Sequence, residues 1–127
     1  MTLRLVDPAK LRHIEGHSVR RVAWLEKKIV AAGRWSKPLA IEGCHHLVMD
    51  GQHRMEVAVL LGLRRVPVVT FSYDEVEIWS LRPQYAFTWE DVVARALAGD
   101  IYPYKTVKHR FPTAIPACDF TLQELRK

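Results

Sequence analysis

The residues with the clearest chemical potential stand in one short segment, Asp50-Gly51-Gln52-His53-Arg54, between an apolar run and a helical pattern. Glycine permits a sharp turn and a close approach of the backbone to a ligand. The helix that follows presents unpaired N–H groups at the positive end of its dipole, which favours an anion. His53 and Arg54 add donors, and guanidinium suits phosphate bidentately. The segment therefore predicts a phosphate cradle, in which Asp50 holds Mg²⁺ or orients a donor.

A structural interpretation of the same segment competes with the cradle. Asp-Gly pairs are frequent in turns, so Asp50 would cap the helix and Arg54 would form a surface salt bridge. A Walker A pattern, Gly-x-x-x-x-Gly-Lys-Ser/Thr, is absent from the sequence. The surrounding sequence has to decide between the two interpretations.

Strands and helices are mixed along the chain. Apolar periodicity and turn signals predict strands at 3–6, 39–41, 46–49, 66–71 and 76–81, and helices at 18–33, 52–61 and 88–97, with a short closing helix at 121–124. Met55, Ala58 and Val59 are expected to form the buried face of the second helix. Residues 100–112 are rich in Tyr, Lys, His and Pro and are expected to be irregular. The pattern predicts the α+β class: one domain over residues 1–127, with a small mixed sheet and about three helices.

Composition and charge limit the class of protein. The 127 residues are 49% hydrophobic and 26% charged, which suits one globular domain with one core. No stretch of eighteen apolar residues predicts a membrane span, and the N-terminus lacks the apolar run of a signal peptide, so a cytoplasmic location is expected. The net charge of +5 and the pI of 9.5 suit an anionic partner, either nucleic acid or a phosphorylated small molecule.

The cysteines and a neighbouring histidine pair predict no further site. Cys44 and Cys118 are expected to be plain thiols, because disulfides are rare in the cytoplasm. His45 and His46 follow Cys44, but adjacent side chains on a strand point to opposite faces and structural zinc needs four ligands. A metal site is therefore not expected in this turn.

The order of motifs resembles the ParB/sulfiredoxin superfamily over residues 3–71. The resemblance rests on Asp-Gly-x-His-Arg at residues 50–54, followed by Leu61-Gly62 and by the Val-Pro-Val run at 66–68. Residues 102–112, with their Lys-Thr-x-x-His run, are similar to the C-terminal segment of the free serine kinases of this superfamily. These are the archaeal ADP-dependent serine kinase and its bacterial relatives from siderophore pathways. The resemblance implies a ParB/sulfiredoxin-like fold for nearly the whole chain.

The resemblance also implies a catalytic base in the first loop. In the free serine kinases a glutamate of this loop accepts the proton, and the matching residue is Glu15. The family usually has His directly before that glutamate, whereas here Ile14 separates His13 from Glu15. His13 and His17 are rival bases in the same loop, so the choice between His13 and Glu15 stays open.

The remaining roles carry over onto two segments. The implied nucleotide contacts are Asp50, Gly51, Gln52, His53 and Arg54, with Asp50 also catalytic and a ligand of Mg²⁺. The implied contacts to the amino-acid substrate are Lys105, Thr106, His109 and, by a looser match, Trp79. ADP or ATP would be the phosphoryl donor, and the sequence does not choose between them.

Two functions follow. The first is a kinase that transfers the terminal phosphoryl group of a nucleotide to a free amino-acid hydroxyl, with L-serine favoured over homoserine or threonine, which differ too little to exclude. The second is a non-catalytic, ParB-like nucleotide-binding module that acts with DNA or a protein partner. Sulfiredoxin chemistry is disfavoured, because Gln52 stands where its motif needs cysteine. No specific nucleic acid and no membrane are expected as partners, because no room remains for a DNA-reading domain; the oligomeric state is not predicted.

Overall fold

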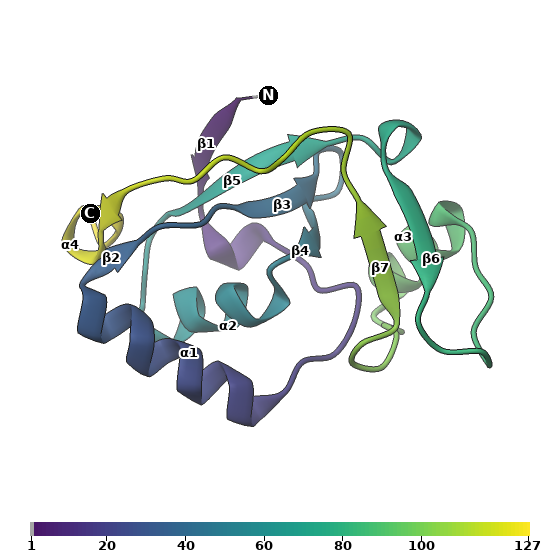
Figure 1. The fold of residues 1–127 in the computed structure, drawn as a ribbon, viewed down its shortest axis with the longest axis horizontal. Coiled ribbons are helices and arrows are strands. Elements are labelled where there is room, and N and C mark those ends of the chain that lie inside the picture. The colour runs from purple at the N-terminus through teal and green to yellow at the C-terminus, as the bar shows by residue number, and fades with distance from the viewer. Residues whose placement is uncertain (1) are drawn as a thin grey trace.

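The computed structural model describes residues 2–127 and confirms the α+β class (Figure 1). Its strands are β1 (Leu3–Val6), β2 (Arg34–Trp35), β3 (Leu39–Glu42), β4 (Leu47–Asp50), β5 (Val66–Phe71), β6 (Glu77–Ser80), β7 (Val107–Arg110) and β8 (Phe120–Thr121). Its helices are α1 (Val19–Ala32), α2 (Gln52–Leu60), α3 (Trp89–Ala98) and α4 (Leu122–Leu125), with 3₁₀ turns η1 (Pro8–Lys10) and η2 (Tyr73–Glu75). The three longer helices and the short closing helix agree with the prediction. No helix of the described part is long and apolar enough to cross a membrane.

The central sheet is mixed and has the strand order β1-β5-β3-β4. β5 pairs with β1 in antiparallel and with β3 in parallel fashion, and β4 closes the edge antiparallel to β3. Figure 1 shows α1 and α2 together on one side of this sheet, whereas β6, β7 and α3 form the opposite end of the molecule. β2 with β8 and β6 with β7 form two separate antiparallel pairs.

Strands β3, β4 and β5 are covered on both faces, so they read as continuous apolar runs, whereas the edge strand β1 alternates and is largely exposed. Along β3, Leu39 and Ile41 belong to the core that contains the residues of α1, α2 and α4. Ala40, between them, belongs to a second core with Val69 of β5 and residues of α3 and β7. The chain therefore has two adjoining cores, where the composition suggested one.

Helix α1 begins and ends where its capping residues require. The Ser18 hydroxyl accepts the N–H of Arg21 at 3.2 Å, and Gly33 ends the helix with a φ of 67°, a left-handed conformation that glycine adopts without strain. Val22 is buried, and Leu25 and Ile29 pack partly against the same core. This amphipathic face holds α1 against α2.

Helix α2 departs from the prediction in its buried face. Met55 and Ala58 are buried as expected, but Val59 is 52% exposed and the prediction is wrong for this residue. Val57 is fully buried instead. The reason is that α2 is covered on two adjacent faces, by the sheet and by α1, so a single stripe at helical spacing does not describe it.

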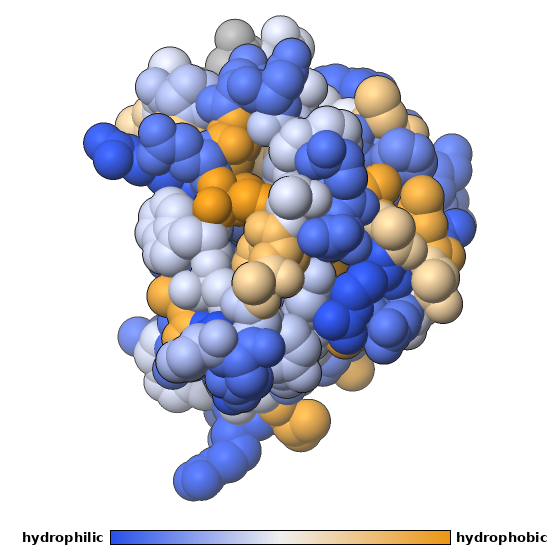
Figure 2. All heavy atoms as spheres, turned by 90° about the vertical axis from the view of Figure 1, so that its right-hand side faces the viewer, coloured by the Kyte–Doolittle hydropathy of each residue, from blue (hydrophilic) through white to orange (hydrophobic). Residues whose placement is uncertain are grey.

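The expectation of an irregular segment over residues 100–112 is wrong for Val107–Arg110, which form β7. This strand pairs with β6 in the register Ile78↔His109 and Trp79↔Lys108. The basic side chains of β7 make its alternating pattern hard to recognise in the sequence. The strand is stabilised by pairing with the distant strand β6 rather than by local strand propensity. Figure 2 faces this end of the molecule, where hydrophilic residues surround small apolar groups.

The turn between β3 and β4 is organised by a buried carboxylate. Glu42 is 6% exposed and accepts the backbone N–H groups of Cys44 at 2.6 Å and His45 at 2.8 Å. The imidazole of His45 lies 3.3 Å from the same carboxylate. Cys44 and Cys118 are free thiols. The Cys-His-His turn thus has a structural explanation.

Candidate active site

A cleft of about 1010 Å³ lies where the C-terminal end of β4 meets the start of α2, with the segment leading into β7 opposite. The predicted site residues that line it are Glu15, Asp50, Gly51, Gln52, His53, Arg54, Lys105 and His109. The cleft lining contains more basic than acidic side chains. The acidic ones are Glu15 and Asp50, and the basic ones are Arg21, Arg34, Lys37, Arg54, Lys105 and Lys108. A basic concave site of this kind suits a polyanionic ligand.

The start of α2 is open to a ligand. Gly51 is its N-cap with a φ of 112°, and no side chain caps the helix. A Cβ at Gly51 would lie 2.5 Å from the Leu39 side chain, so only glycine fits there. The first regular helical bond runs from the Met55 N–H to the Gly51 carbonyl at 2.8 Å, which leaves the preceding N–H groups of the helix available to an anion. The alternative in which Asp50 caps the helix is therefore wrong.

Arg54 is a buried tether rather than a surface residue. Its side chain is 12% exposed, and its Nη1 donates to the carbonyls of Lys37 at 2.9 Å and Pro38 at 2.6 Å. Its Nη2 lies 3.5 Å from the Asp50 carboxylate. Burial lowers the pKa of Arg54, but a guanidinium remains charged at neutral pH. Arg54 therefore fixes the loop before β3 and places positive charge at the floor of the cleft.

His53 is held as a neutral imidazole. Its Nε2 accepts the backbone N–H of Ser18 at 3.1 Å, which requires the ring proton to sit on Nδ1. Burial lowers the pKa of His53, and the nearby charge of Arg21 lowers it further. The ring lies edge-on to Tyr104 with centroids 5.3 Å apart. Nδ1–H is therefore the donor that His53 can offer to a ligand.

Gln52 lines the cleft but directs its side chain into the protein. It is 8% exposed, and its Nε2 donates to the Val48 carbonyl at 2.6 Å. Its Oε1 accepts a short hydrogen bond from Nδ1 of His13. Its side-chain amide is thus committed, and the group that Gln52 offers to an anion is its backbone N–H.

Glu15 joins the first loop to the segment before β7. It is 8% exposed, and its carboxylate accepts the N–H of Lys105 at 2.8 Å and that of Val107 at 2.9 Å. Lys105 adopts a left-handed φ of 58°, which turns the backbone so that these N–H groups converge. Burial raises the pKa of Glu15, and the backbone hydrogen bonds oppose that rise. The result is a rigid carboxylate of raised basicity at the edge of the cleft.

His109 and Lys105 complete the far wall, whereas two predicted substrate contacts lie elsewhere. The Nε2 of His109 lies 3.1 Å from the Tyr73 hydroxyl, and burial lowers the pKa of His109 to about 4, so it is neutral at pH 7. Thr106 is fully buried, and its hydroxyl donates to the Pro103 carbonyl at 2.6 Å. Trp79 is 43% exposed on β6 and is not among the residues that line the cleft.

The sequence did not single out several residues of the cleft. Arg21 lies in the first turn of α1 and lines the cleft. Tyr104 stands in the segment that carries the serine-kinase resemblance and packs against His53. Trp35 is 1% exposed and forms part of the cleft wall. The position of Arg21 three residues after the Ser18 cap, in the first turn of the helix, was the available signal, because helix starts often face anion sites.

The fold is that of the free serine kinases, as the sequence resemblance implied. A free serine kinase in complex with AMP matches with a TM-score of 0.88 at 15% identity, over 97% of this chain and 93% of that chain. A glutamate-to-alanine variant of a free serine kinase in complex with ADP matches with a TM-score of 0.89 at 14% identity, over 98% and 94%. SbnI with a C-terminal truncation, from Staphylococcus aureus, matches with a TM-score of 0.88 at 13% identity, over 98% and 89%. No family model and no curated protein matches the sequence.

Proposed function

We propose that this chain is a kinase that transfers the terminal phosphoryl group of ADP or ATP to the hydroxyl of free L-serine, giving O-phospho-L-serine. The observation that carries the proposal is the convergence, in one basic cleft, of an uncapped helix start, a buried carboxylate and a wall of polar side chains. The shared fold supports it, since the matching structures include free serine kinases with AMP or ADP bound.

The nucleotide phosphates would bind at the start of α2. The free N–H groups there, the Nδ1–H of His53 and the charge of Arg54 neutralise phosphate oxygens, which is the main requirement of phosphoryl transfer. Asp50 is 47% exposed in the cleft beside this helix start, and Mg²⁺ in phosphate sites is usually held by one or two carboxylates. Asp50 fits that role, and a bound Mg²⁺ would supply further charge neutralisation.

Glu15 would act as the general base. The serine hydroxyl oxygen forms a bond to the transferred phosphorus as the bond to the leaving nucleotide oxygen breaks, and the hydroxyl proton passes to the carboxylate. The carboxylate of Glu15 accepts the backbone N–H groups of Lys105 and Val107, and with about four lone-pair sites it keeps acceptor capacity for the substrate. Lys105 and His109, on the same side of the cleft, would hold the carboxylate of the amino acid.

The direct test is the formation of the product. The full chain is incubated with L-serine, Mg²⁺ and either ADP or ATP, and O-phosphoserine is measured by mass spectrometry. Parallel reactions with L-homoserine, L-threonine and D-serine define the acceptor. Nucleotide binding by calorimetry without any phosphorylated amino acid would contradict the kinase and favour the non-catalytic nucleotide-binding module.

A substitution at the far wall tests the substrate site. His109→Ala should raise the KM for serine by about 10- to 150-fold, the equivalent of a lost hydrogen bond to a charged group, about 1.5–3 kcal/mol. Nucleotide affinity should stay close to that of the wild type, because His109 lies on β7 and not at the start of α2. Steady-state kinetics and calorimetry measure the two effects. His45→Ala, outside the cleft, is the control, and loss of nucleotide binding in His109→Ala would refute the division of roles.

A further inference from the structure

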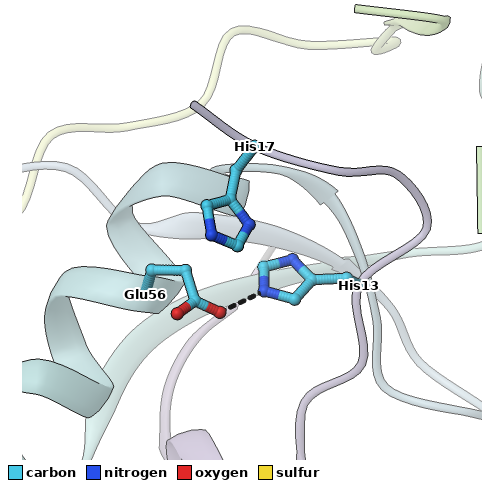
Figure 3. A group of neighbouring side chains, drawn as sticks. All are labelled: His13, His17 and Glu56. Atoms are coloured by element: carbon cyan, nitrogen blue, oxygen red, sulfur yellow. Dashed lines mark hydrogen bonds and ion pairs between the residues drawn. The ribbon is translucent and has the colours of Figure 1, made fainter. Parts of the chain in front are cut away.

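A second group of side chains gathers beside the cleft but does not line it. His13 and His17 come from the first loop and Glu56 from α2, and one ligand atom from each lies within 4.8 Å of the others (Figure 3). The side chains of His13 and Glu56 are 16% and 27% exposed, so the group is partly shielded from water. Figure 3 shows both imidazoles and the carboxylate directed toward one another.

The hydrogen bonds of His13 determine which ring nitrogen faces this group. Gln52 donates through Nε2 to the Val48 carbonyl, so its Oε1 is the atom that accepts from Nδ1 of His13. With Nδ1 donating to Gln52, Nε2 is the nitrogen of His13 that faces the group, and it lies 2.5 Å from Oε1 of Glu56. A ring nitrogen and a carboxylate oxygen this close are joined either by a proton on Nε2, as in an imidazolium–carboxylate ion pair, or by a metal ion bound to both atoms. A metal-binding histidine typically has this arrangement, because a hydrogen-bond acceptor next to the site fixes its other nitrogen.

His17 supplies the third donor. Its ring lies 5.2 Å from that of His13 between centroids, and within residues 2–127 it makes ring contacts but no hydrogen bond. Its nitrogens are therefore available. A tetrahedral ion with ligands at about 2.0–2.1 Å holds ligand atoms about 3.4 Å apart, so side-chain shifts on the order of 1 Å would complete the geometry.

We propose that His13, His17 and Glu56 bind a divalent transition-metal ion such as Zn²⁺, at a site separate from the phosphate cradle. Two imidazoles and one carboxylate select Zn²⁺, Co²⁺ or Ni²⁺ over Mg²⁺, which prefers oxygen ligands only. Three protein ligands leave further coordination positions for water.

The site would join two parts of the proposed active site. Glu15 stands between His13 and His17 in the first loop, and Glu56 stands one turn after His53 on α2. An ion bound to all three ligands would lock the loop that carries the carboxylate onto the helix that carries the cradle. Metal binding is therefore expected to stabilise the fold without nucleotide present.

The test uses the full chain stripped of metal by chelation. Calorimetric titration should show one Zn²⁺ per chain, and Co²⁺ should give the visible absorption of a site with nitrogen ligands. His17→Ala and Glu56→Gln should each weaken Zn²⁺ binding by at least about 100-fold. Loss of a residue that only hydrogen-bonds to a ligand already costs about 10- to 100-fold, and loss of a ligand should cost more. Zn²⁺ should raise the Tm of the wild type but not that of His17→Ala, and circular dichroism verifies that both variants fold.

The matched control is His45→Ala, which removes a histidine from the Cys44–His46 turn and should leave the stoichiometry and affinity unchanged. Three results would overturn the proposal: no stoichiometric Zn²⁺ binding by the wild type, wild-type affinity in both His17→Ala and Glu56→Gln, or loss of binding in His45→Ala alone. In the first two cases the group is only an ion pair between a protonated His13 and Glu56.

Discussion

Replacing Glu15 by glutamine is expected to lower kcat by about 10²–10⁴-fold, the usual contribution of a positioned general base. Glutamine can accept a hydrogen bond from the serine hydroxyl, but it cannot take the proton. The KM for serine and the Kd for nucleotide should change far less than kcat. Single-turnover measurements with ADP or ATP and L-serine would separate the chemical step from binding.

The same substitution should also reduce stability. One oxygen of Glu15 becomes an NH₂ group that faces the N–H of Lys105 or Val107, so a donor meets a donor. The unfolding free energy should fall by about 1–3 kcal/mol, the cost of an unsatisfied buried group. Glu42→Gln is the matched control, because Glu42 is equally buried and also accepts two backbone N–H groups, but lies outside the cleft. It should lose stability and keep kcat.

The pH profile gives a second measurement of the same residue. Burial raises the pKa of Glu15 above its usual value, so protonation disables the base at a higher pH than for an exposed glutamate. Activity should therefore fall on the acid side earlier than an ordinary glutamate would cause. Wild-type turnover in Glu15→Gln together with inactivity of His13→Ala would instead assign the base to His13.

Arg54→Ala is expected to have the second largest effect, because Arg54 serves both ligand and fold. Loss of a charge-assisted phosphate contact should weaken nucleotide binding by about 10- to 150-fold, or about 1.5–3 kcal/mol. The carbonyls of Lys37 and Pro38 would lose their donor, so the urea midpoint should fall as well. Calorimetry with ADP and chemical unfolding measure the two effects.

Two companion variants separate the roles of Arg54. Arg54→Lys keeps the positive charge, but an ammonium group lacks the rigid fork of donors that contacts both carbonyls and Asp50. Compared with Arg54→Ala, the lysine variant should therefore regain part of the nucleotide affinity and little of the stability. Arg34→Ala removes an exposed cation of the same cleft, paired with Asp119 at 2.5 Å, and should affect both quantities weakly. Unchanged ADP affinity in Arg54→Ala would exclude a phosphate role for this residue.

The elements around the cradle could be predicted because their signals are local. Helix α1 begins after Ser18 and ends at Gly33, as those two residues predicted. The apolar run at 66–71 forms β5, also as predicted. The Asp-Gly-x-His-Arg segment forms the strand–turn–helix that was expected. These features depend on backbone preferences and capping chemistry that operate within a few residues.

The rest of the site depends on contacts between distant residues, and no local pattern encodes them. The strand β7 exists because it pairs with β6, and the carboxylate of Glu15 is held by backbone groups of the 105–107 segment. The hydrogen bond between Gln52 and His13 could not be predicted either, because the motif suggested only that Gln52 contacts a ligand. Whether Thr106 and Trp79 contact a substrate stays a prediction, with Thr106 buried and Trp79 outside the cleft lining.

The hydrogen bond from Lys105 to Glu15 spans 90 positions of the chain, and that separation has a consequence for the order of folding. During synthesis all strands of the sheet β1-β5-β3-β4 have been added to the chain before Lys105, because the last of them, β5, ends at Phe71. Until the later segment folds against the first loop, the Glu15 carboxylate lacks the backbone N–H groups of Lys105 and Val107 as partners. Contacts of such long sequence separation form slowly. Hydrogen-exchange pulse labelling during refolding should therefore show protection of β5 amides before that of the Lys105 and Val107 amides.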